Sequence, residues 1–142
     1  MRSLYTVVLA ALLPLAALAG ELAPRDAAEV VLADQLYVKR PIVVFADTPK
    51  DPNYIRQMEL LAQAYPDLAE RDVIVVTDTD PAAKTEWRTR LRPNGFMLVI
   101  MDKDLQPVVR KPLPWDVREI THAIDKLPLR RTEMLEQNPA GR

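Results

Sequence analysis

The chain has 142 residues, enough for one globular domain, with 49% hydrophobic and 27% charged residues. Its formal net charge of −1 comes with no basic stripe of the kind that binds nucleic acid and no acidic block of the kind that forms a solvating tail. It contains no cysteine, which excludes disulfide bonds and any thiol chemistry by its own side chains.

Residues 1–19 have the pattern of a secretory signal. Leu4–Ala19 is apolar, and the small residues of Ala17–Ala19 predict cleavage before Gly20. The apolar run is shorter than the ~20 residues that span a bilayer, and Pro14 interrupts it. We therefore expect a periplasmic or secreted protein with no stable membrane anchor once the signal is removed.

The first half of the remaining chain predicts a lead-in segment, a strand and a helix. Residues 20–39 are the lead-in, and the apolar run "PIVVFAD" at 41–47 predicts a strand buried on both faces. After a short loop, Asp51 and Pro52 are a good helix cap and first helical residue. Apolar residues then follow at helical spacing until Pro66, where we expect the helix to stop.

The second half begins with another strand and another helix. "VIVVTD" at 73–78 predicts a second buried strand. Asp80 and Pro81 repeat the pairing of cap and proline and predict a helix, which carries Trp87 on its apolar stripe.

Two more strands and a helix complete the pattern. We expect a third buried strand at 95–102 and a fourth at 108–113, the latter at an edge because prolines lie beside and within it. A last helix is expected from Trp115 and Asp116 to Pro128.

This order of elements predicts an α/β fold of thioredoxin-like type. Long apolar strands separated by helices indicate a mostly parallel sheet of about four strands, and the short last connection indicates an antiparallel edge hairpin. Residues 40–134 are the expected domain, and residues 135–142 are expected to be a flexible C-terminal tail.

The loop after the first strand lies where thioredoxins carry their two cysteines. Here Pro49 and Pro52 occupy those places, and Gly95-Phe96 stands where thioredoxins have a cis-proline. The loop is either a degenerate active site retained for binding or a plain turn in which Asp51 caps the helix. The pattern favours the plain turn.

Two other groups are weaker candidates for sites. Asp78-Thr79-Asp80 resembles the nucleophile motif of haloacid-dehalogenase-type phosphatases, but the usual Gly and Thr are Pro81 and Ala82, and Asp80 is better explained as a helix cap. His122 is the only histidine and is expected to be exposed, which makes a poor metal site.

The charged C-terminal run is a candidate of a different kind. Arg130, Arg131 and Glu133 follow the last predicted helix, and arginine forks suit carboxylate or phosphate groups. A structural clamp and a ligand site remain equally open.

"IDKLPLRRTEM", residues 124–134, resembles the closing signature of a thioredoxin-like family of uncharacterised exported bacterial proteins, with relatives in equarin and sushi-repeat extracellular proteins. The residues that carry the resemblance are Asp125, Pro128, Arg130, Arg131, Glu133 and Met134. "RDVIVV" at 71–76 and "LVIMDKD" at 98–104 are also similar, although the family's two turn glycines are absent from the second. The resemblance implies a thioredoxin-like fold close to that of peroxiredoxins, without the peroxidatic cysteine, and no established reaction.

We therefore predict a non-redox binding module with a protein or envelope partner, no cofactor, no metal and no nucleic acid. Ligands favour the carboxyl ends of parallel strands, so the hypothesised surface joins the loop, the second strand and the tail: Asp47, Lys50, Asp51, Asp78, Arg130, Arg131 and Glu133. The alternative is a non-thiol hydrolase that acts on a phosphate or sugar through Asp47, Asp78 and Arg130. A third possibility is that the tail serves folding alone.

Overall fold

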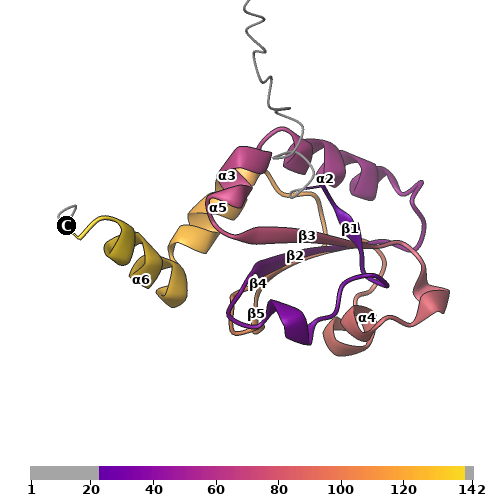
Figure 1. Cartoon of the computed structure of the whole chain (residues 1–142). Coiled ribbons are helices and arrows are strands. Elements are labelled where there is room, and N and C mark those ends of the chain that lie inside the picture. Colours follow the sequence, from indigo (N-terminus) through magenta and orange to yellow (C-terminus); the bar gives the residue numbers. More distant parts are fainter. Residues whose placement is uncertain (1–22, 140–142) are drawn as a thin grey trace, which may run out of the picture.

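A computed structural model describes residues 23–139, in which five strands form one sheet in the order β1-β3-β2-β4-β5 (Figure 1). The predicted signal sequence lies outside the described residues. The strands are β1 (Arg25–Asp26), β2 (Arg40–Phe45), β3 (Val73–Asp78), β4 (Met97–Met101) and β5 (Pro107–Lys111). No helix within residues 23–139 is long and apolar enough to cross a membrane.

The α/β class and the antiparallel edge hairpin are as expected, but the sheet is evenly mixed rather than mostly parallel. β1, β3 and β2 are parallel, whereas β4 is antiparallel to β2 and β5 is antiparallel to β4. Met97 enters the sheet opposite Phe45, the last residue of β2. The connection after β3, residues 79–96, therefore keeps the chain at the end where β2 and β3 finish, so β4 runs back.

Helices cover both faces of the sheet (Figure 1). On one face lie α2 (Pro52–Ala62), α3 (Tyr65–Ala69) and α5 (Val117–Asp125), and on the other lie η1 (Ala33–Gln35), η2 (Pro81–Ala83) and α4 (Glu86–Leu91). Side chains alternate across β2, so Ile42 and Val44 pack in the first core while Val43 and Phe45 pack in the second. The last helix is α6 (Pro128–Gln137).

The helix boundaries confirm the predicted cap at Asp51, correct the one at Asp80, and correct the helix ends predicted at Pro66 and Pro128. Asp51 Oδ1 accepts hydrogen bonds from the N–H of Asn53 at 2.8 Å, and Pro52 is the first residue of α2, as expected. Asp80 caps only the short η2, and α4 begins later with Thr85 as its cap. Pro66 and Pro128 lie in the first turns of α3 and α6 rather than ending the helices before them, because proline fits that turn without losing a hydrogen bond.

Both ends of the predicted domain extend further than expected. The lead-in supplies β1, which makes the fifth strand, and its Ala27 and Val30 are buried in the second core. The Trp87 indole N–H donates to the Val30 carbonyl at 2.8 Å, which ties the lead-in to α4. At the other end, α6 continues through Gln137, so residues 135–137 are helical rather than part of a flexible tail.

Candidate functional site

The structure places the predicted site residues at opposite ends of the sheet. Phe45 pairs with Asp78 at the carboxyl ends of β2 and β3, whereas Arg40 pairs with Val73 at the amino ends. Glu133 of α6 binds Arg40, so the tail lies at the amino end. The six residues of β2 separate the two ends by ~17 Å.

The expected convergence of loop, strand and tail is therefore wrong. The reason lies in α5, the helix that precedes the tail. It finishes with Asp125, whose carboxylate binds Arg71 just before β3 begins. The chain has thus already reached the amino end of the sheet when α6 starts.

At the amino end, charged side chains form a set of linked ion pairs, which we call the amino-end network. It comprises Arg40, Arg71, Asp72, Asp102, Lys103, Asp125, Arg130 and Glu133.

Arg40 and Glu133 form the centre of the amino-end network. Arg40 is fully buried, and its two terminal nitrogens donate to the two carboxylate oxygens of Glu133 at 3.0 and 2.9 Å. The Arg40 Nε donates to Asp102 at 2.9 Å, and Lys103 Nζ contacts Glu133 at 2.8 Å. A buried arginine is tolerable only when its charge and its donors are satisfied in this way.

Arg130 extends the amino-end network, whereas its neighbour Arg131 does not. Arg130 is buried and lies 3.4 Å from Asp125 and 3.5 Å from Glu133. It also donates to the carbonyl of Glu70 at 3.3 Å. Arg131 is exposed, and among residues 23–139 its side chain makes no ion pair. The geometry of Arg130 is that of a structural clamp.

The pKa values in the amino-end network follow from these contacts. Burial alone would raise the pKa of Glu133, but hydrogen bonds from Arg40 and Lys103 outweigh it and lower that pKa to about 2. Burial also opposes the charged form of Asp125, whose pKa is nevertheless lowered by Arg71 and Arg130. Each of these groups is held in its charged form.

At the carboxyl end, Asp78 is buried and fully engaged. Its carboxylate accepts a hydrogen bond from the Thr85 hydroxyl at 2.6 Å and forms an ion pair with Arg88 Nη2 at 2.9 Å. Arg88 also donates to the carbonyl of Ala46 at 3.1 Å, and its guanidinium carbon lies 5.4 Å from the centroid of the Phe45 ring. Asp78 thus joins α4 to the sheet.

The neighbouring loop offers few groups for chemistry. Asp51 is used as the cap of α2. Asp47 and Lys50 are exposed, and neither side chain makes an ion pair within the described part of the chain. The plain-turn interpretation accounts for Asp51 and Pro52.

Sequence reasoning did not identify the residues that pair with the tail. From the sequence, Arg40 is placed only at the start of the domain, Asp102 only at the end of the predicted strand 95–102, and Lys103 only within the stretch 98–104 that resembles the family. A usable signal was present, because a charged residue directly before an entirely apolar strand needs a counter-charge once it is buried.

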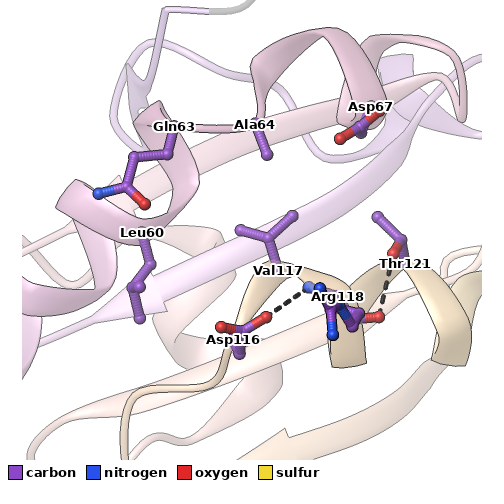
Figure 2. Close-up of a pocket in the computed structure, with 8 residues that line it drawn as sticks. All are labelled: Leu60, Gln63, Ala64, Asp67, Asp116, Val117, Arg118 and Thr121. Carbon is purple, nitrogen blue, oxygen red and sulfur yellow. Dashed lines mark hydrogen bonds between the residues drawn. The ribbon is translucent and has the colours of Figure 1, made fainter.

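A groove of about 350 Å³ lies between α2–α3 and α5. Figure 2 shows its lining, in which Asp116 accepts from the Arg118 N–H at 2.7 Å and the Thr121 hydroxyl donates to the Arg118 carbonyl at 3.0 Å, so that these two polar groups are used within α5 and its cap. The groove is lined by Leu60, Gln63, Ala64, Asp67, Asp116, Val117, Arg118 and Thr121. Within residues 23–139, no three acidic, histidine or cysteine side chains are placed to hold a metal ion.

Residues 31–133 match the family described as "Domain of unknown function (DUF4174)". The chain belongs to this family. The match to DUF4174 begins at Val31, inside the lead-in segment, and ends at Glu133, the centre of the amino-end network. No curated protein matches the chain.

Two solved structures are similar to this DUF4174 chain. One is Plasmodium yoelii Prx1a, modified at its N-terminus and described as an artifactual octamer, with 16% identity and a TM-score of 0.53 over 77% of this chain and 82% of the other. The second is Plasmodium yoelii thioredoxin peroxidase I, with 18% identity and a TM-score of 0.49 over 80% and 86%. The first likeness shows a thioredoxin-type fold and nothing about activity.

Proposed function

We propose that the protein is a non-redox interaction module that binds a protein partner through its lead-in segment. The observation that carries this proposal is a run of three consecutive exposed apolar residues, Leu36, Tyr37 and Val38, which we call the apolar ridge. Their side chains and backbone remain 44%, 68% and 56% exposed. Such runs are unfavourable on a soluble surface unless they serve a contact.

The backbone of the apolar ridge is held in an unusual conformation. Tyr37 has a φ of 58°, in the left-handed region that a tyrosine rarely adopts. Its N–H donates to the carbonyl of Lys103 at 2.7 Å, and the Val38 N–H donates to the carbonyl of Gln35 at 2.9 Å. A fixed, strained backbone that presents aromatic surface is typical of a binding contact.

The chemistry of the carboxyl end also favours binding over reaction. The chain has no cysteine, so it has no thiol with which to act as a peroxidase or thiol-disulfide oxidoreductase. The alternative hydrolase would need Asp78 and Arg130 in one site, yet they lie at opposite ends of the sheet and are held by Arg88 and Glu133. No observation favours that alternative.

Export is a further part of the proposal, supported by the signal pattern of residues 1–19. A relationship to equarin and sushi-repeat modules would suit an extracellular contact, and it rests on the resemblance of residues 124–134. Expression with a C-terminal tag, followed by mass measurement of the exported product, tests the predicted cleavage before Gly20. A product that retains residues 1–19 contradicts it.

The binding proposal is tested by capture from the exported fraction of the source cells after chemical cross-linking. We expect a partner that is retained by the wild type and lost by Leu36→Ser and Tyr37→Asn, since asparagine tolerates the left-handed backbone. Leu113→Asn is the matched control, because Leu113 is 64% exposed and lies outside the lead-in. Equal capture by all variants contradicts a role for the apolar ridge, and no capture by the wild type contradicts the module.

A further inference from the structure

The loop between α4 and β4 contains the one Asn-Gly dipeptide of the chain, Asn94-Gly95. Asn94 is exposed, and no hydrogen bond to a residue in the range 23–139 holds its side-chain amide. The side chain is therefore free to turn towards the backbone of the residue that follows it.

Gly95 supplies a backbone nitrogen that is not in use. Its N–H makes no hydrogen bond with any residue that the structure describes. Its φ of 63° lies in the left-handed region, and a Cβ built on it would have no heavy atom within 4 Å. Because glycine has no side chain and the space beside its Cα is open, no side-chain atom crowds this nitrogen.

The other two asparagines of the chain lack such a neighbour. Asn53 lies in the first turn of α2, and the N–H that follows it, that of Tyr54, donates to Asp51 Oδ1 at 3.4 Å. Asn138 is followed by Pro139, which has no N–H. Within residues 23–139, Asn94 is thus the asparagine with a free N–H beside it, and the other two are internal controls.

A free N–H next to an asparagine side chain permits a ring closure. The Gly95 nitrogen bonds to Cγ of Asn94, the Cγ–Nδ2 bond breaks, and ammonia leaves with the proton that the Gly95 nitrogen gives up. The cyclic imide that remains is opened by water. Addition of water at Cγ gives aspartate, whereas addition at the main-chain carbonyl carbon of residue 94 breaks the original peptide bond and gives isoaspartate, in which the chain runs through Cγ.

We propose that Asn94-Gly95 is a site of self-modification, at which the folded protein slowly loses ammonia from Asn94 and acquires an isoaspartyl linkage shortly before β4. Water replaces ammonia overall, so the step needs no cofactor and, unlike the proposed function, no partner. The product carries an additional negative charge and an additional main-chain carbon.

The position of the linkage gives the modification a structural effect. Phe96, the next residue but one, is buried in the first core, and Met97 begins β4 opposite Phe45. An added main-chain carbon at residue 94 changes the path by which the chain reaches both contacts. We expect the modified protein to open more readily at the start of β4.

The experiment incubates the whole chain at neutral pH in water enriched in heavy oxygen, followed by peptide mapping with mass spectrometry. A synthetic peptide of residues 91–97 sets the time of incubation. We expect the Asn94 peptide of the folded protein to lose its amide and gain heavy oxygen, while the Asn53 and Asn138 peptides keep their amides. An intact Asn94 after the synthetic peptide has converted, or equal conversion of all three asparagines, overturns the proposal.

The variant Asn94→Gln identifies the isoaspartyl product and its effect. An isoaspartyl methyltransferase with a labelled methyl donor should label the incubated wild type and not the incubated variant. Amide hydrogen exchange at Leu98 and Val99 should become faster in the incubated wild type and stay unchanged in the incubated variant. Equal labelling of both proteins overturns the assignment to Asn94, and unchanged exchange in the labelled wild type overturns the effect on β4.

Discussion

The two ends of the sheet differ in how many buried or partly buried ion pairs they contain, although at both ends these pairs join helices to the sheet. At the amino end, eight charged side chains from the strands, their flanking loops and the last two helices form the amino-end network. At the carboxyl end, one buried pair, Asp78 and Arg88, joins α4 to the sheet. The comparison teaches that charged side chains near a favoured ligand position do not by themselves indicate a ligand site. At both ends of this sheet they form ion pairs within the protein.

The largest expected effect is the loss of the buried arginine at the amino end. Arg40→Met leaves Asp102 without its ion-pair partner and leaves Glu133 with only Lys103 and Arg130, and we expect a loss of about 3–5 kcal/mol in the free energy of unfolding. Urea denaturation measures it. Arg56→Met is the control, because the Arg56–Glu59 pair is exposed and should contribute at most about 1 kcal/mol. Similar losses in both variants would contradict the comparison.

The second effect is a dependence of stability on pH at the same end. The pKa of Glu133 falls from 4.5 to about 2 on folding, so its contribution is complete above pH 4.5 and is lost as the pH falls towards 2. Arg40, Lys103 and Arg130 are the positively charged groups that contact its carboxylate. Denaturation at pH 7 and pH 3 should show the wild type losing more stability than Glu133→Gln.

The matched control for this measurement is Glu136→Gln, which changes an exposed glutamate on the same helix. It should behave as the wild type does at both pH values. A wild type and a Glu133→Gln variant with the same loss of stability between pH 7 and pH 3 would show that Glu133 is not the linked group.

At the carboxyl end we expect a smaller cost from Asp78→Asn. The substitution keeps the size of the side chain but removes the charge that Arg88 binds, and about 2 kcal/mol should be lost. Asp47→Asn, at an exposed position just beyond β2, should change stability by no more than about 0.5 kcal/mol. Thermal melting of both variants measures the difference. If Asp78→Asn lowers stability no more than Asp47→Asn does, the Asp78–Arg88 ion pair does not stabilise the fold.

The smallest effects separate two adjacent arginines. Arg130→Ala removes a buried clamp and should cost about 1–2 kcal/mol, whereas Arg131→Ala at an exposed position should cost less than about 0.5 kcal/mol. Thermal melting of the two single variants measures the difference. If Arg131→Ala were the more destabilising, the orientation of α6 described here would be incorrect.

Much of the fold could be predicted because its signals are local. The apolar runs of β2, β3 and β4 and the cap at Asp51 depend on residues that are close together in sequence. The local signal for the start of α4 is misleading for the same reason, since Asp80 and Thr85 are both good caps. Only the path of the chain leaving β3 decides that Thr85 serves α4.

The candidate site was less predictable because it depends on long-range placement. The direction of α5 decides at which end of the sheet the tail lies, and no residue of the tail encodes that direction by itself. The spacing of Arg130 and Glu133 did contain part of the answer, because residues three apart on a helix are neighbours. Arg40, the partner of Glu133, could not be identified without knowing the order of the strands in the sheet.

The contact between Arg40 and Glu133 joins residues 93 positions apart. During synthesis at roughly 5–20 residues per second, Arg40 is made several seconds before Glu133, the carboxylate that binds its two terminal nitrogens. Until then buried Arg40 can form an ion pair only with Asp102, and its two terminal nitrogens lack their carboxylate. The last helix therefore acts late in folding, and we expect the domain to become fully stable only after synthesis of Glu133 is complete.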